Sequence, residues 1–265
     1  MNVDRFHPGK SLLIPEQGTN RTVLWENNLG SWRSHMNAIR AIIENRLSSA
    51  LIMEDDVDWD VNIKSQLSRF APGARQIADT TSSPAPDGPY GSEWDVLWLG
   101  HCGEHFPEMM EPKLETPDTR KYIIEDDMTV PGFDKLKGFI RWKEYPEHTR
   151  FVHRTGGPIC TFAYALSYKG AQKLLYALSV DGLRGPFDMA LSDLCRYQHY
   201  GANCVSVTPP YFFHHKSKGY MSGDSDIQGY GGGGEMREKG MTENLVYSVR
   251  LNIEQMLKGE EPVAQ

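Results

Sequence analysis

Residues 50–60 have the sequence ALIMEDDVDWD, in which a short apolar run passes directly into a cluster of acids. An apolar run of this length after an amphipathic helix is typical of a buried strand in a parallel sheet. We expect residues 50–53 to form such an interior parallel strand, with Glu54, Asp55 and Asp56 at its carboxyl end. Open α/β sheets bind their ligands at that end, so the acids mark the candidate site.

Helical and apolar segments alternate on both sides of this stretch. Before it, Trp32, Met36, Ile39 and Ile43 recur at the spacing of one helix face, and Ser31 is the expected N-cap. After it come apolar runs at 95–100, 160–166 and 203–207, and helical patterns at 167–178 (capped by Ser167), 187–197 and 242–256 (capped by Thr242). This alternation predicts a single α/β domain with a mainly parallel central sheet flanked by helices.

The chain has 265 residues, which is enough for one domain with its own core. Residues 1–28 show no clear periodicity, and the main domain is expected to span 29–228. Within it, residues 72–93 are rich in Pro, Ser and Gly, which predicts a mobile surface insertion. Residues 229–265 hold a Gly-rich loop and a helix.

Composition excludes several classes of protein. The net charge is −7 and no dense Lys/Arg run is present, so we expect no nucleic-acid partner. No stretch approaches the ~20 apolar residues of a membrane span, and the first residues lack a signal-peptide pattern. A cytoplasmic location is the default expectation, and the lumen of the secretory pathway applies if the N-terminus is incomplete. The four cysteines lack zinc-knuckle spacing and are expected to be buried reduced thiols.

The acidic cluster has two interpretations on residue types alone. Side chains two apart in extended chain point the same way, so Glu54 and Asp56 would present their carboxylates together. Such hard oxygen ligands suit Mn²⁺, Mg²⁺ or Ca²⁺, and a bound cation would bridge the two phosphates of a nucleotide-sugar. Alternatively the acids cap the next helix, which fits Asp58 and Asp60 well. Both interpretations stay open at this level.

Other polar residues outside this cluster are candidates for the site. Asp188 precedes a helix and is our candidate general base, with an ordinary helix N-terminal carboxylate as the alternative. His215 and Lys216 lie in a basic segment of an acidic protein, where His215 is a further candidate metal ligand and Lys216 a source of positive charge. A second acidic triplet at 125–127 follows only a short apolar run and predicts a solvated turn.

Residues 30–59, GSWRSHMNAIRAIIENRLSSALIMEDDVDW, resemble the core of glycosyltransferase family 25, which includes lipopolysaccharide-type and collagen galactosyltransferases. The family pattern is a Gly-x-x-x-Ser-His block that opens a helix, here Gly30, Ser34 and His35, then a strand that ends in Glu-Asp-Asp. Further resemblances keep the family order and extend the match over roughly residues 28–228; they lie at 95–100, 157–171, 185–188 and 225–227.

The resemblance implies a GT-A type fold and an inverting transfer of galactose or glucose from a UDP-sugar to a glycan or glycoprotein acceptor. It implies that Glu54 and Asp56 bind a divalent cation, with Mn²⁺ expected before Mg²⁺. The donor nucleotide is expected to contact four residues, which are Ser34, His35, Asp55 and Lys216.

In one respect the chain departs from the family. Only 29 residues precede Gly30, where family members have a βα unit that holds the nucleotide base. Two other functions therefore stay open. One is a non-catalytic relative that acts as a binding protein, and the other is a metal-dependent phosphoesterase that uses the same carboxylates.

Overall fold

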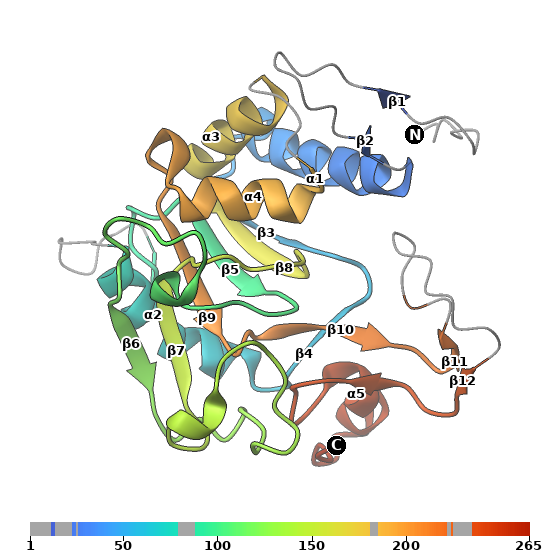
Figure 1. Cartoon of the computed structure of the whole chain (residues 1–265). Coiled ribbons are helices and arrows are strands. Elements are labelled where there is room, and N and C mark those ends of the chain that lie inside the picture. The colour runs from blue at the N-terminus through green and yellow to red at the C-terminus, as the bar shows by residue number, and fades with distance from the viewer. Residues whose placement is uncertain are drawn as a thin grey trace.

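The computed structural model describes residues 12–13, 23–24, 26–78, 88–180, 185–221, 224 and 235–265. Over these residues the fold is mixed α/β, with one nine-stranded sheet and five α-helices (Figure 1). The predicted α/β class is confirmed at this level. In the part of the chain that is described, no helix has the length and apolar character needed to cross a bilayer.

The central sheet is a single row of strands with a branch. The row runs β3 (Ser49–Met53), β8 (Ala163–Ser167), β5 (Val96–Gly100), β9 (Cys204–Thr208), β7 (Arg150–Arg154) and β6 (Lys121–Ile124). The branch starts where β10 (Phe212–Lys216) pairs with the end of β5, and β10 also pairs with β4 (Val57–Trp59) and β13 (Met241–Thr242). Short two-stranded pairs join β1 (Leu12–Leu13) to β2 (Val23–Leu24) and β11 (Gly219–Tyr220) to β12 (Met236–Arg237).

The predicted mainly parallel sheet is wrong, because most described pairings are antiparallel. Parallel pairing joins β5 to β9 and to β10, whereas β8 lies between β3 and β5 and runs against both. An apolar run reports burial, but side chains alternate in the same way in either direction of pairing. The sequence pattern therefore contained no information on strand direction.

The strand before the acids is also not interior. Among the described residues β3 pairs only with β8, so it is the edge strand of the sheet that these residues form. Ala50 and Ile52 pack against the core, while Leu51 and Met53 are each 44% exposed. The run SALIM thus belongs to a strand with one covered face, and its continuous apolarity wrongly suggested burial on both faces.

Helices cover both faces of the sheet. Three of them, α1 (Glu26–Glu44), α3 (Tyr168–Ser179) and α4 (Phe187–Arg196), lie together on one side in Figure 1 and share a core with β3, β5 and β8. On the other side α2 (Ile63–Ile77) packs against β6 and β7. The last helix, α5 (Val249–Lys258), lies beside β4. Three short 3₁₀ turns complete the fold at Pro107–Met109, Trp142–Glu144 and His199–Gly201.

Some helices begin at other residues than the sequence predicts. Ser167 caps α3 as expected, since its side chain accepts from the Gly170 N–H. By contrast α1 begins at Glu26 rather than at Ser31, and α5 is capped by Ser248 because Thr242 belongs to β13.

The predicted insertion at 72–93 is partly helix. Residues 72–77 continue α2, because Ala74 and Ile77 are buried and extend its apolar face past Pro72. Residues 79–87 of this insertion lie outside the described residues. The same is true of most of residues 1–25 and of the Gly-rich loop at 229–234.

All four cysteines form disulfides, which corrects the expectation of reduced thiols. Cys102, after β5, bonds to Cys160, before β8, and Cys195 in α4 bonds to Cys204 in β9. The partners are 58 and 9 residues apart in sequence, so only the fold brings each pair within 5.5 and 5.4 Å between Cα atoms.

Candidate functional site

The acidic residues lie at an edge of the sheet where several strands end. Because β3 and β5 both run antiparallel to β8, they are parallel to each other and their carboxyl ends meet at the same edge. The carboxyl end of β9 lies there as well, since β9 is parallel to β5. Glu54 follows β3 directly, and its N–H donates to the Phe162 carbonyl at 3.0 Å. The acids therefore face the segment that leads into β8.

Glu54 is held by two residues from distant parts of the chain. Its Oε1 accepts a hydrogen bond from Thr161 Oγ1 at 2.8 Å and lies 3.7 Å from His35 Nε2. His35 is buried in α1, where Nδ1 lies 2.9 Å from Tyr164 Oη and the ring stacks on Phe187 at 4.2 Å. His35 is thus fixed on both sides and orients the Glu54 carboxylate.

Asp188 approaches the same segment from α4. It lies in the first turn of that helix, and its Oδ2 accepts from the Cys160 N–H at 2.9 Å. Cys160 has a φ of +67°, a conformation that few side chains adopt, and its disulfide to Cys102 helps to hold it there. Cys160 and Thr161 therefore bring Asp188 and Glu54 to adjacent residues of one loop.

Asp56 contacts His214, which sequence reasoning had not selected. Asp56 Oδ2 lies 3.3 Å from His214 Nε2, and the side chain as a whole is 46% exposed. Its Oδ1 atom, however, is buried and has no hydrogen-bond partner among the described residues. Burial raises the pKa of Asp56 above its ordinary value, and the charges of Glu54 and Asp55 raise it further, while His214 opposes them. The carboxylate is therefore short of positive charge.

Three predicted site residues lie elsewhere. Ser34 Oγ donates to the Gly30 carbonyl at 3.0 Å on the exposed side of α1. Lys216 Nζ pairs with Glu243 Oε1 at 3.2 Å. His215 Nδ1 lies 2.8 Å from Thr242 Oγ1 and 3.8 Å from Asp58 Oδ2.

The position of His215 follows from strand geometry. Neighbouring residues of β10 face opposite sides of the sheet, so only one of two adjacent histidines faces Asp56. The sequence did not show which one. Asp55 is exposed, and its carbonyl accepts from Arg250 Nη2 at 2.5 Å. No group of three or more metal-ligating side chains is assembled in the described part of the chain.

Asp58 and Asp60 have structural roles. Both are fully buried. Asp58 accepts hydrogen bonds from Thr242 Oγ1 at 2.6 Å and from the Ser248 hydroxyl. Asp60 accepts from the N–H of Asn62 at 2.8 Å, just before α2, and from the N–H of Tyr247 at 3.0 Å. These two acids thus anchor the C-terminal segment as well as the start of α2, while Glu54, Asp55 and Asp56 do not cap that helix.

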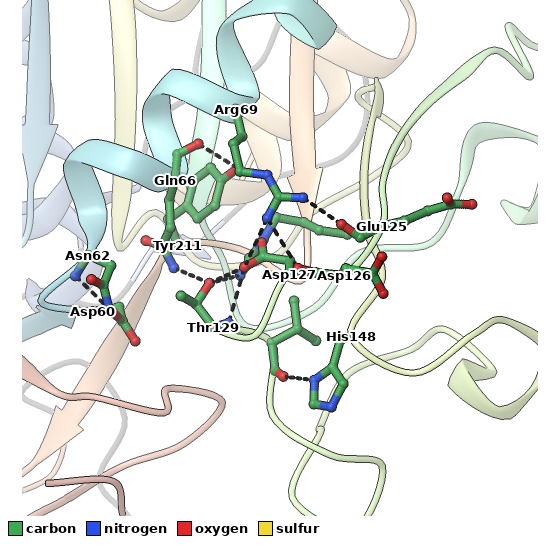
Figure 2. Close-up of polar contacts among 12 residues, drawn as sticks. Asp60, Asn62, Gln66, Arg69, Glu125, Asp126, Asp127, Thr129, His148 and Tyr211 are labelled. Atoms are coloured by element: carbon green, nitrogen blue, oxygen red, sulfur yellow. Dashed lines mark hydrogen bonds and ion pairs between the residues drawn. The ribbon is translucent and has the colours of Figure 1, made fainter.

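The predicted solvated turn at 125–127 is wrong for Asp127, which is buried. Its Oδ2 accepts from Arg150 Nε at 2.7 Å, and Arg150 is buried too. Figure 2 shows Asp127 facing Thr129, with Arg69 above it. Burial alone would raise the pKa of Asp127, but the Arg150 charge and the bonds from Thr129 and Arg150 outweigh it and the pKa is lowered. Only Glu125 and Asp126 are exposed.

Comparison with known protein families finds no family model that matches the chain, and no curated protein matches it. The resemblance to glycosyltransferase family 25 accordingly rests on the motifs themselves. Of those motifs, the Ser-His block contributes His35, the acidic block contributes Glu54 and Asp56, and the Pro-Phe-Asp turn contributes Asp188.

Proposed function

We propose that the chain is a glycosyltransferase that depends on a divalent cation and moves galactose or glucose from a UDP-sugar to a glycan or glycoprotein hydroxyl. The observation that carries the proposal is the buried Asp56 Oδ1, which has no partner among the described residues and lies on an acid whose pKa is raised. A buried carboxylate oxygen without a donor costs free energy, and a cation would remove that cost. The donor, the inversion and a GT-A type core come from the resemblance.

Two carboxylates of the acidic cluster supply the oxygen ligands that hard cations prefer, although the described residues assemble no group of three metal-ligating side chains. Asp56 and Glu54 would hold Mn²⁺ or Mg²⁺ through oxygen, and His214 rather than His215 adjoins this pair. When bound, such a cation neutralises the charge that develops on a departing diphosphate. His35 and Thr161 orient Glu54 for this role.

Asp188 is the proposed general base. The hydrogen bond from the Cys160 N–H fixes the position of the Asp188 carboxylate, which would accept a proton from the acceptor hydroxyl. The base and the cation ligands approach one loop, formed by Cys160 and Thr161, so proton removal and departure of the diphosphate would occur side by side.

The direct test is UDP release from UDP-galactose and UDP-glucose, with Mn²⁺ and with chelator. We expect release only with the cation. Asp188→Asn should abolish transfer and leave UDP affinity nearly unchanged, because the base acts on the acceptor. Near-normal turnover by Asp188→Asn would remove Asp188 from the mechanism. Phosphate release from simple phosphomonoesters without sugar transfer would favour the phosphoesterase.

A non-catalytic binding protein of the same fold is the second candidate. The position of β3 favours it. The acids follow an edge strand rather than an interior one, so a described strand flanks them on one side only. This alternative predicts ligand binding without UDP release in the same assay.

We also propose an oxidising location, which is the second of the two compartments considered from the sequence. Two disulfides join four cysteines, and such bonds persist mainly in secreted or lumenal proteins. Alkylation of the unfolded, unreduced protein should modify no cysteine. Alkylation of all four cysteines would contradict this proposal and indicate a reducing compartment.

A further inference from the structure

A second cleft lies at the same edge of the sheet, beyond the carboxyl end of β5, and takes no part in the function proposed above. It is lined by His101, Glu104, Lys137, Phe139, Trp142 and Phe213, among others. It adjoins the first site through the disulfide, since Cys102 lines the cleft and its partner Cys160 donates its N–H to Asp188.

Three polar atoms of the cleft residues are buried without a hydrogen-bond partner among the described residues. They are His101 Nδ1, Glu104 Oε2 and Trp142 Nε1. The three residues are only 1%, 1% and 8% exposed. Buried polar groups are nearly always hydrogen-bonded, so three unpaired ones on residues that line one cleft point to a missing polar occupant.

The occupied atoms of the same residues define what this occupant must offer. His101 Nε2 lies 3.1 Å from the Val207 carbonyl, so it is the donor and leaves Nδ1 as an acceptor. Glu104 Oε1 accepts from the Gly156 N–H at 2.6 Å, and the Ser206 hydroxyl and the Gly157 N–H also interact with this carboxyl group. Oε2 nevertheless makes no hydrogen bond of normal geometry among the described residues, so it is the oxygen that remains for an occupant. The Trp142 indole offers a donor.

These groups are neutral. Burial lowers the pKa of His101 to about 3 and raises the pKa of Glu104 to about 8. Although His101 Nε2 and Glu104 Oε2 are 3.5 Å apart, the two are therefore not an ion pair near pH 7. The cleft offers an acceptor, an acid O–H and an indole N–H, a set that suits a hydroxyl group, which both donates and accepts.

The size and walls of the cleft restrict the ligand further. Its free space is about 10 Å³, room for one water-sized group and not for a sugar ring. Phe139 is 42% exposed, and its ring lies so close to Gly103 that a Cβ there would meet it at 2.9 Å. The Phe139 ring stacks on His105, with 5.1 Å between the ring centroids, and its exposed part is an apolar wall of the kind that small-molecule sites use beside a few polar groups.

We propose that this cleft binds a neutral carbohydrate, with one hydroxyl group inserted between His101, Glu104 and Trp142 and the sugar ring against Phe139. Its role as the acceptor subsite rests on the proposed function, whereas carbohydrate binding does not. Both sites lie at one edge of the sheet, which is the arrangement that transfer between two bound sugars requires.

The test is saturation-transfer NMR on the full chain without UDP or cation, using the methyl glycosides of galactose, glucose, mannose and N-acetylglucosamine. At least one should bind. Trp142→Phe, which removes the indole donor, and Phe139→Ala, which removes the wall, should each weaken binding about tenfold, the equivalent of ~1.4 kcal/mol. Tyr220→Ala removes an exposed aromatic side chain that does not line the cleft. It is the matched control and should bind the glycosides as the wild type does.

Two outcomes would overturn the proposal. One is that none of the four glycosides binds, in which case the cleft holds water only. The other is that binding survives both Trp142→Phe and Phe139→Ala, in which case the sugar binds elsewhere. Thermal melts of both variants verify folding. Neither UDP nor a cation is present in this test. A failure to bind glycosides would therefore not count against the cation-dependent donor site, and a failure to bind UDP would not count against carbohydrate binding in the cleft.

Discussion

Among the described residues, Asp56 and His214 form the closest contact between a carboxylate of Glu54, Asp55 or Asp56 and a potential positive charge, with Oδ2 and Nε2 3.3 Å apart. The other oxygen of the same carboxylate is buried and unpartnered among the described residues. His214 therefore contacts one oxygen of the Asp56 carboxylate, Oδ2, and leaves the other oxygen, Oδ1, for a cation. This asymmetry distinguishes Asp56 from Asp58, whose oxygens are hydrogen-bonded by the protein itself.

We predict that His214→Ala weakens Mn²⁺ binding about tenfold or more, the usual effect of removing a group that supports a metal ligand. Loss of His214 also removes the charge that does most to lower the pKa of Asp56, so competition from protons increases. Titration of Mn²⁺ followed by electron paramagnetic resonance measures the affinity. His215→Ala is the matched control on the opposite face of β10 and should bind Mn²⁺ as wild type. Equal losses in the two variants would contradict the assignment.

Asp127→Ala should lower the free energy of unfolding by about 3–5 kcal/mol, because Arg150 would be left buried without its carboxylate. Glu125→Ala removes an exposed carboxylate from the same triplet and should change stability by less than about 0.5 kcal/mol. Urea unfolding of both variants measures the difference. A loss as small for Asp127→Ala as for Glu125→Ala would show that the pair is not buried in solution.

Stability should depend on pH through three buried groups with opposite signs. Burial lowers the pKa of His101 to about 3 and of His153 to about 4, from 6.5 in the unfolded chain. The unfolded state binds more protons below pH 6.5, so both histidines cost stability as the pH falls. Glu104 keeps its proton up to about pH 8 when folded but only to 4.5 when unfolded, so it costs stability as the pH rises.

The sum of these terms places a maximum in stability near pH 6.5. Between pH 4.5 and 6.5 the two histidines outweigh Glu104, and these three groups together give a net change of about 1.4 kcal/mol per pH unit. Between pH 6.5 and 8, Glu104 is the one of the three that still contributes, with the opposite sign. Urea unfolding across this range measures the curve. Glu104→Gln should remove the decline above pH 6.5. A decline that persists in that variant would assign it to other groups.

Much of the fold could be predicted from local pattern. The buried face of α1, the cap of α3 by Ser167 and the strand β5 follow from periodicity and from the chemistry of one side chain. Strand direction could not be predicted, because it depends on which strands meet across the sheet. The edge position of β3 and the two disulfides depend on the same long-range pairing.

The candidate site, like the fold, could be predicted only in part from the sequence. A run of acids after an apolar strand is unusual and indicates Glu54 and Asp56, while His35 and Asp188 stand in motifs of the family that the sequence resembles. The choice of His215 over its neighbour failed because adjacent residues of a strand differ only in the face they occupy. The burial of Asp127 could not be predicted, because nothing in its local sequence indicates its partner Arg150, which is 23 residues away.

The most direct measurement is calorimetric titration of UDP into the wild type, Asp56→Ala and Glu125→Ala, each with Mn²⁺ and with chelator. Glu125 is the control because Asp127, the buried member of that triplet, affects stability. We expect wild type and Glu125→Ala to bind UDP only with Mn²⁺, and Asp56→Ala to lose most of that affinity. Equal binding of UDP by the wild type in chelator would contradict the cation-dependent site. No binding even with Mn²⁺ would contradict the glycosyltransferase and favour the non-catalytic binding protein.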